Sequence, residues 1–211
     1  MIVQTNFHLL LSHNEHLDRI DECQIPGNIL KNIPTTDLLN ICLQYPLLNN
    51  YTASNSPNKG LAAIISTFNG LTEFMSHSDS HKVLLNYYAN ESVSNINNSQ
   101  DNGGYTFDFC AVELLLSQPV LLKRFTQKEQ KDILNLILSK YNEKAKYEEY
   151  FGFYGKMTTA FVSNRYAESL GKATDVSNKK KELFTSEMLV ADFSIIDQTI
   201  LDVSSFAKAQ K

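Results

Sequence analysis

The chain has 211 residues, 43% of them hydrophobic and 20% charged, which suits one fairly large domain or two small ones sharing a core. A formal net charge of −4 argues against a nucleic-acid-binding surface, which is normally basic. No apolar run approaches the ~18 residues of a membrane span. The three cysteines are widely separated, so neither a disulfide framework nor a zinc knuckle is expected.

The N-terminal part of the chain predicts short helical elements. An imperfect apolar stripe predicts a helix over residues 5–22, and the sequence Cys-Gln-Ile-Pro-Gly at 23–27 predicts a break. One further helical turn is expected over residues 28–32.

A stretch that occurs twice organises the following part of the chain. Residues 38–69 align without a gap with residues 111–142. In each copy an apolar helix is stopped by a proline, a short polar turn follows, and a second helix ends in an aromatic residue and an asparagine. The matching pairs are Leu43 and Leu116, Pro46 and Pro119, Leu48 and Leu121, Leu61 and Leu134, Ile64 and Ile137, Ile65 and Leu138, Ser66 and Ser139, Phe68 and Tyr141, and Asn69 and Asn142.

The helix boundaries of both copies follow from local chemistry. Proline lacks a backbone N–H and clashes with the preceding turn, so the first helix is expected to end just before Pro46. Pro57 suits the first turn of the next helix, and Thr126 with Glu129 predicts a capping box in the second copy. Such a unit cannot bury its apolar stripe alone, so we expect the copies to pack against each other. Chance convergence of two amphipathic helix pairs is the alternative.

Further helices are predicted between the two copies. Apolar spacing predicts a kinked or separate helix over 71–75, and a capping signal predicts another helix from residue 80 to residue 90. Residues 91–105 are rich in Asn, Ser, Gly and Asp, which favour turns, so this range is interpreted as a flexible linker.

The C-terminal third predicts helices separated by one polar connection. A helical region is expected over 145–169, with a kink or close helix approach at Gly152 and Gly155. Residues 170–181 form the polar connection, and a final helix or helix pair is expected over 183–208. Period-two alternation of β-branched residues is essentially absent, so no strand is expected.

These elements together predict an all-α fold. The expected architecture is a multi-helical right-handed or superhelical array of helix-Pro-helix units, forming a single domain over 1–211.

Several short motifs carry a resemblance to a known family. They are Gln24-Ile25-Pro26, Thr36-Asp37-Leu38-Leu39, Cys42-Leu43-Gln44-Tyr45-Pro46-Leu47, Phe68-Asn69-Gly70-Leu71-Thr72-Glu73 and Leu116-Ser117-Gln118-Pro119. With them, most of residues 24–165 resembles an uncharacterised family of helical bacterial proteins, found mainly in gut Bacteroidetes and often carrying an export signal. The resemblance implies an all-α fold and an extracytoplasmic location, and it implies no activity. The apolar run at residues 7–11 is too short for the core of a signal peptide, so the expected alternatives are a cytoplasmic protein or a mature chain whose leader has been removed.

Aromatic side chains gather in the 145–169 region and have two interpretations. They could line a groove for a peptide or glycan, or they could pack in the core. The candidate binding residues are Tyr147, Tyr150, Phe151, Tyr154 and Tyr166. Glu143, Glu148 and Glu149 could pair with other acidic residues for general acid–base chemistry. Because Lys140, Lys144 and Lys146 surround them, they are interpreted as a solvated helix face with i,i+4 pairs.

Two candidate enzymatic sites are weighed against simpler interpretations. Cys110 is expected to open an apolar helix, where the helix N-terminus would lower the thiol pKa. No histidine follows His81, so the papain-like order of nucleophile and base fails, and a buried cysteine is the alternative. His77 and His81 have a zinc-ligand spacing, but a helix start at 78–80 would place His77 outside that helix. His13 and His16 form a similar pair, and surface histidines are the alternative for both.

The leading functional hypothesis is a non-enzymatic helical-repeat interaction or scaffold protein that binds a peptide, protein or glycan in a groove. The competing hypothesis is a cysteine- or metal-dependent hydrolase using Cys110 or the pair His77 and His81. No glycine-rich phosphate-binding motif occurs, so no cofactor is expected.

Overall fold

The computed structural model describes residues 20–173, 175, 178–189 and 191–210. Every regular element in these ranges is helical, which confirms the all-α prediction. With η denoting a 3₁₀ helix, the elements are η1 (Ile20–Cys23), α2 (Gly27–Leu30), α3 (Thr35–Leu43), η2 (Leu48–Ala53), α4 (Pro57–Thr67), α5 (Asn69–Ser76), α6 (Ser80–Asn90), η3 (Val93–Asn98), α7 (Asn102–Leu116), α8 (Pro119–Leu122), α9 (Gln127–Lys144), η4 (Ala145–Tyr147), α10 (Glu148–Ser169), α11 (Lys179–Glu187) and α12 (Phe193–Ala209). No helix among the described residues is long and apolar enough to cross a membrane.

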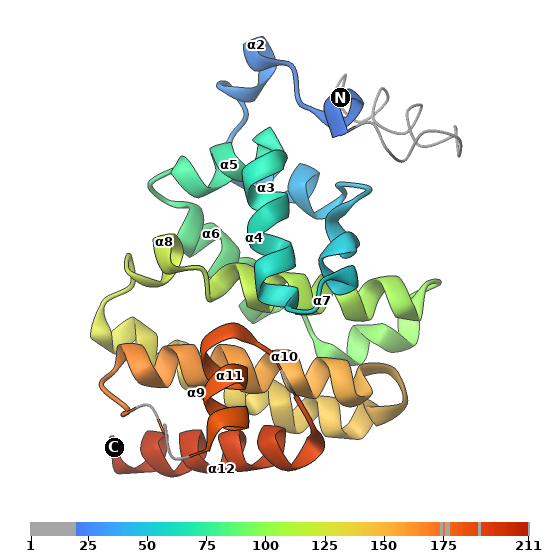
Figure 1. The fold of residues 1–211 in the computed structure, drawn as a ribbon. Coiled ribbons are helices and arrows are strands. Elements are labelled where there is room, and N and C mark those ends of the chain that lie inside the picture. The colour runs from blue at the N-terminus through green and yellow to red at the C-terminus, as the bar shows by residue number, and fades with distance from the viewer. Residues whose placement is uncertain (1–19, 174, 176–177, 190, 211) are drawn as a thin grey trace.

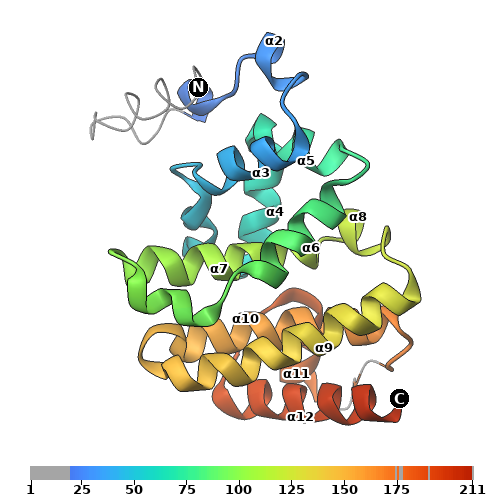
Figure 2. The same cartoon turned by 180° about the vertical axis from the view of Figure 1, so that it is seen from behind.

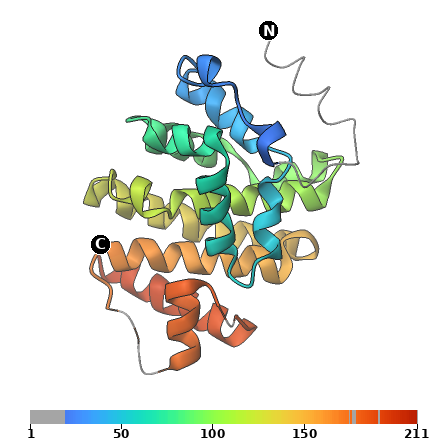
Figure 3. The same ribbon diagram turned by 45° about the horizontal axis from the view of Figure 1, so that its top comes forward.

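The helices form two groups on either side of α7 (Figures 1 and 2). The short helices α3 to α6 gather at one end, and the longer α9, α10 and α12 lie together at the other. Helix α10 packs against α7, α9 and α12, whereas α7 also contacts η2, α4 and α6. Seen from the tilted direction of Figure 3, α7 crosses the molecule between the two groups.

Helix α7 occupies the centre because its C-terminal half is apolar on every side except at Glu113. Every residue from Phe109 to Leu116 is buried. A helix that is hydrophobic all round is stable only with neighbours on all its faces. The two groups of helices supply those neighbours.

The two sequence copies adopt matching helix boundaries at their prolines. Helix α3 ends at Leu43, and α7 ends at the aligned residue Leu116. Pro46 and Pro119 are both exposed, Pro46 in a turn and Pro119 as the first residue of α8. The predicted proline stop is therefore present in both copies.

The second helices of the copies differ in length and surroundings. Phe68 ends α4 as predicted, and Asn69 opens α5. In the second copy the helix was predicted to end at Tyr141 and Asn142. This prediction is wrong, because α9 continues past Asn142 to Lys144. Helix α4 packs on η2 and α5, whereas α9 packs mainly on α10. The capping box at Thr126 is present, with Glu129 accepting from the Thr126 backbone.

Other boundaries largely follow the predictions. Residues 5–19 of the first predicted helix, and with them His13 and His16, lie outside the described residues. The turn at 28–32, the helix at 71–75 and the helix at 80–90 correspond to α2, α5 and α6. The predicted helix pair at the C-terminus is present as α11 and α12.

The range interpreted as a linker, 91–105, contains regular structure. It holds η3 and the first turn of α7. Val93 and Ile96 are fully buried, so two apolar side chains among polar neighbours anchor the segment to the core. The Asp101 side chain accepts from the backbone N–H of Gly104 and caps α7.

A kink in α10 confirms the role predicted for glycine there. Gly152 has φ of 35° and ψ of −139°, a conformation essentially restricted to glycine. Helix α10 contacts both α7 and α12.

Candidate functional site

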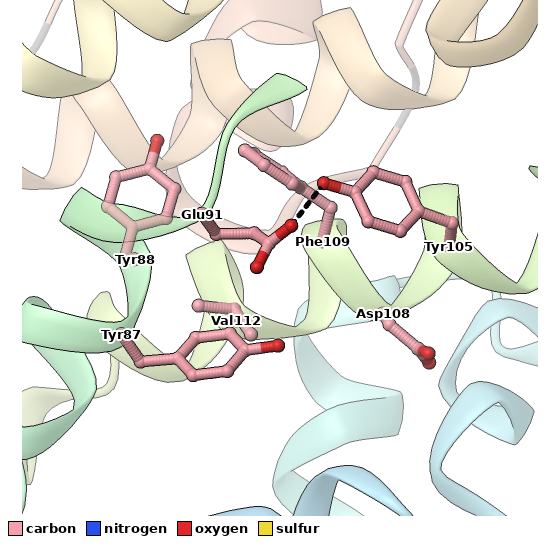
Figure 4. Close-up of a pocket in the computed structure, with 7 residues that line it drawn as sticks. All are labelled: Tyr87, Tyr88, Glu91, Tyr105, Asp108, Phe109 and Val112. Carbon is pink, nitrogen blue, oxygen red and sulfur yellow. Dashed lines mark hydrogen bonds between the residues drawn. The ribbon is translucent and has the colours of Figure 1, made fainter. Parts of the chain in front are cut away.

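A pocket opens between the end of α6 and one face of α7 (Figure 4). Its volume is about 90 Å³. The lining residues are Tyr87, Tyr88, Glu91, Tyr105, Asp108, Phe109 and Val112. It therefore combines four aromatic rings with two carboxylates.

The helix register gathers these side chains. On α7 the lining residues are spaced 3, 1 and 3 apart from Tyr105 to Val112, which places them on one helix face. On α6 the contributors come from its last turn and from Glu91, its C-terminal cap. The buried anchors of η3 hold the α6–α7 connection in place.

Glu91 is fixed at the pocket by one of its two carboxylate oxygens. The Tyr105 hydroxyl donates to Oε1 at 2.5 Å, and the Asn95 amide donates to the same atom at 2.9 Å. Burial, and then the bond to Glu91, raises the pKa of Tyr105. The other oxygen, Oε2, has no hydrogen-bond partner in the described part of the chain. Figure 4 shows the Glu91 carboxylate lying between Tyr105 and the Val112 side chain.

Asp108 and Tyr87 add two further polar groups. The Asn49 amide donates to Oδ1 of Asp108 at 3.0 Å, and burial raises the pKa of this carboxyl. Burial, followed by the charges of Glu91 and Asp108, raises the pKa of the Tyr87 phenol. Among the described residues, neither Oδ2 of Asp108 nor the Tyr87 hydroxyl has a hydrogen-bond partner.

A wider groove adjoins the pocket and lies between α3 and α6. Its volume is about 470 Å³, within the size range of ligand sites. Two residues, Tyr87 and Glu91, line both the groove and the pocket. The other lining residues are Thr36, Leu39, Asn40, Asp79, Lys82, Val83, Asn86 and Asn90. We call the two together the α3–α6–α7 surface.

Behind the pocket lies a fully buried ion pair. Lys144 donates from Nζ to Oε1 of Glu113 at 2.8 Å, and both side chains are completely buried. The Tyr88 hydroxyl donates to the same oxygen at 2.8 Å, and Thr159 bonds to the other oxygen at 2.9 Å. Lys140 is also buried and donates to the Glu91 carbonyl. The prediction of a solvated face is therefore wrong for Lys140 and Lys144. Lys140 packs against the end of α6 and against α7, and Lys144 reaches Glu113 of α7 and Thr159 of α10.

The aromatic residues predicted as a binding groove lie mostly in or against the core. Phe151 and Tyr166 are buried, and the Tyr166 hydroxyl donates to the Leu116 carbonyl. They therefore line no accessible groove, and core packing, the alternative interpretation, describes them. Tyr147, Tyr150 and Tyr154 are half-buried and pack against the same core. These aromatic side chains are buried or half-buried because α10 packs against α7, α9, α11 and α12.

The premise of a Cys110 nucleophile is also wrong. Helix α7 begins at Asn102, so Cys110 lies two turns inside the helix rather than at its N-terminus. The side chain is fully buried, and burial raises the pKa of the thiol to about 12. This is the opposite of the lowered pKa that a nucleophilic cysteine needs.

The burial of the cysteines predicts a difference in thiol reactivity. Cys42 and Cys110 are fully buried, whereas Cys23 is only half-buried. In the native protein we expect Ellman's reagent to modify one thiol quickly, and all three only after unfolding in urea. A Cys23→Ser variant should then show almost no fast reaction. Fast modification of Cys110, located by mass spectrometry, would contradict this assignment.

His77 and His81 do not share a helix face. His77 caps the end of α5, where Nδ1 lies 2.9 Å from the Thr35 hydroxyl and Nε2 lies 3.6 Å from Glu73. His81 is in α6 and its ring packs edge-on against Phe125 at 5.1 Å. Burial, then the nearby Arg124 charge, lowers the pKa of His81. Within the described ranges no group of three or more His, Cys, Asp or Glu side chains is placed to hold a metal ion.

The α3–α6–α7 surface was not predicted from the sequence. The spacing of Tyr105, Asp108, Phe109 and Val112 is the one signal that could have indicated a mixed polar and aromatic face on α7. No protein-family model, curated protein or solved structure matches the chain significantly. The resemblance to helical bacterial proteins therefore stays a prediction, and the functional argument depends on the geometry.

Proposed function

We propose that the chain is a non-enzymatic binding protein that holds an extended peptide segment of a partner protein in the α3–α6 groove. The observation that carries this proposal is the groove itself. It is a concavity with a volume of about 470 Å³, and it is joined to a smaller pocket.

The groove has the chemistry that a peptide backbone requires. Its floor includes the buried Leu39 and the half-buried Val83, and its sides carry the exposed amides of Asn40 and Asn86. An amide side chain offers both donors and an acceptor, so it can pair with peptide N–H and C=O groups. Tyr87 is the one aromatic residue among the groove lining, so the broad stacking surface typical of sugar sites is missing there.

The charges along the surface favour a basic peptide. Asp79, Glu91 and Asp108 are acidic, and Lys82 is the basic residue among the lining residues of groove and pocket. Such an excess of one sign steers a partner of opposite charge and disfavours an acidic one.

We also infer that two helix-Pro-helix units form the scaffold of a superhelical array. The matched ends of α3 and α7 and the two exposed prolines support this inference. The different partners of α4 and α9 indicate that the units have diverged in packing.

Selection of peptides on the full-length chain tests the binding proposal. We expect a random peptide library to yield basic sequences that bind with a dissociation constant of about 100 μM or tighter. Asn86→Arg places a bulky cation in the groove and should weaken binding at least about 10-fold, a change of about 1.4 kcal/mol. Asn135→Arg changes an exposed asparagine of α9 in the same way and should leave binding unchanged.

Three results would overturn this proposal. They are failure to enrich any peptide, equal binding by the Asn86→Arg variant, and binding of glycans in place of peptides on an array. Mass spectrometry of the bound peptides after prolonged incubation checks the non-enzymatic part, because cleavage products would contradict it.

A further inference from the structure

We propose that the α6–α7 pocket binds a primary ammonium group on an alkyl chain, as at the end of a lysine side chain. This inference rests on the proposed function, because it makes the pocket the specificity site of the peptide groove. Glu91 and Tyr87 line both, so a side chain of a peptide in the groove reaches the pocket without crossing protein.

The pocket offers acceptors that match the three N–H donors of an ammonium group. Among the described residues, Oε2 of Glu91, Oδ2 of Asp108 and the Tyr87 hydroxyl all lack a hydrogen-bond partner. Tyr105 and Asn95 hold Glu91 by its other oxygen, so its carboxylate is oriented before a ligand arrives. Charge-assisted bonds to such a carboxylate are about twice as strong as neutral ones.

The aromatic lining also suits a cation. Tyr87 and Tyr105 are half-buried, so their rings are accessible from the pocket, and Phe109 lies beneath them as buried lining. Cations are attracted to the faces of such rings. The chain already uses this interaction nearby, since Lys144 Nζ lies 4.6 Å from the Phe109 ring centroid and Lys140 Nζ lies 5.1 Å from that of Tyr88.

Size and charge narrow the ligand class further. A volume of about 90 Å³ holds about six water-sized groups, which is enough for the five non-hydrogen atoms of a lysine side chain beyond Cα but not for the seven of an arginine side chain. Glu91 and Asp108 contribute two negative charges, and the buried Lys140 contributes one positive charge nearby. A neutral alkyl side chain in the pocket would remove water from Oε2 of Glu91 without donating a hydrogen bond to it, which costs free energy.

Titration of the full-length chain with two matched probes tests this inference. The probes are Nα-acetyl-lysine-N-methylamide and its neutral isostere Nα-acetyl-norleucine-N-methylamide, followed by NMR shifts of the tyrosine rings. We expect weak binding of the lysine probe, at about 1 mM, and at least about 10-fold weaker binding of the norleucine probe. Glu91→Gln should weaken the lysine probe about 10-fold, whereas Glu149→Gln, at an exposed position of α10, should not.

A second variant keeps the test decisive if Glu91→Gln perturbs the fold. Tyr87→Phe removes one acceptor and keeps the ring, so it should weaken the lysine probe while circular dichroism stays unchanged. Equal binding of both probes, or full binding by well-folded Glu91→Gln and Tyr87→Phe variants, would overturn the proposal. Peptides that depend on Asn86 but show no lysine preference would refute the ammonium pocket and leave the proposed function intact. A lysine probe that binds through Glu91 when no peptide is enriched would refute the peptide groove alone.

Discussion

Replacement of Lys144 by methionine is expected to lower the free energy of unfolding by about 3–5 kcal/mol, because it leaves a buried carboxylate without its cation. Glu113 and Lys144 are fully buried and 2.8 Å apart. Lys144 also donates to the Thr159 hydroxyl at 2.8 Å and lies over the Phe109 and Phe151 rings. Urea unfolding followed by circular dichroism measures the loss.

Two further variants separate charge burial from loss of packing. The double variant Glu113→Leu with Lys144→Met removes both charges, so it should recover most of the stability lost in Lys144→Met. Lys128→Met removes an exposed lysine of the same helix, which pairs with Asp132, and should unfold like the natural chain. A Lys144→Met variant as stable as Lys128→Met, or a double variant no more stable than the single one, would contradict this account.

The ion pair of Glu113 and Lys144 is an example of a feature that could not be predicted from the sequence. Periodicity, prolines and capping residues are local signals, and they predicted α2 to α6 and the stop at Pro119 correctly. Lys144 follows a pattern of alternating charges that usually faces water, and only its packing against α7 and α10 shows that it is buried. No local signal carries that information, because it depends on which helix faces meet.

The candidate site also depends on which helix faces meet, so local sequence signals did not predict it. Aromatic residues are abundant in α10, but their number does not distinguish a groove from a core, and Tyr166 is core. The residues of the α6–α7 pocket were overlooked because Glu91 and Tyr105 lie within a polar stretch interpreted as a linker. Their contact requires η3 to bring the end of α6 back to the start of α7, and η3 is anchored by Val93 and Ile96.

Replacement of Arg124 by methionine is expected to lower the free energy of unfolding by about 2–4 kcal/mol, since it removes three charge-assisted hydrogen bonds. The guanidinium donates to the carbonyls of Met75 and His77 and to the Ser80 hydroxyl, at 2.8, 2.6 and 2.9 Å. Carbonyls at a helix C-terminus lack partners within the helix, and the helix dipole places negative charge there. Arg124, in the turn that precedes α9, therefore supplies hydrogen-bond donors to the carbonyls at the C-terminal end of α5.

The loss of these hydrogen bonds should also affect the groove, because the turn from α5 into α6 leads directly to Asp79, the N-cap of α6, and to Lys82, and both line the groove. Amide hydrogen exchange over residues 77–83 should become faster in Arg124→Met, while exchange in α10 changes little. Arg124→Lys keeps the charge but lacks the planar fork, so it should recover only part of the stability. Lys123→Met, at the exposed neighbouring position, is the matched control and should behave like the natural chain. If Arg124→Met matched that control in both the free energy of unfolding and amide hydrogen exchange, Arg124 would not stabilise the turn between α5 and α6 that borders the groove.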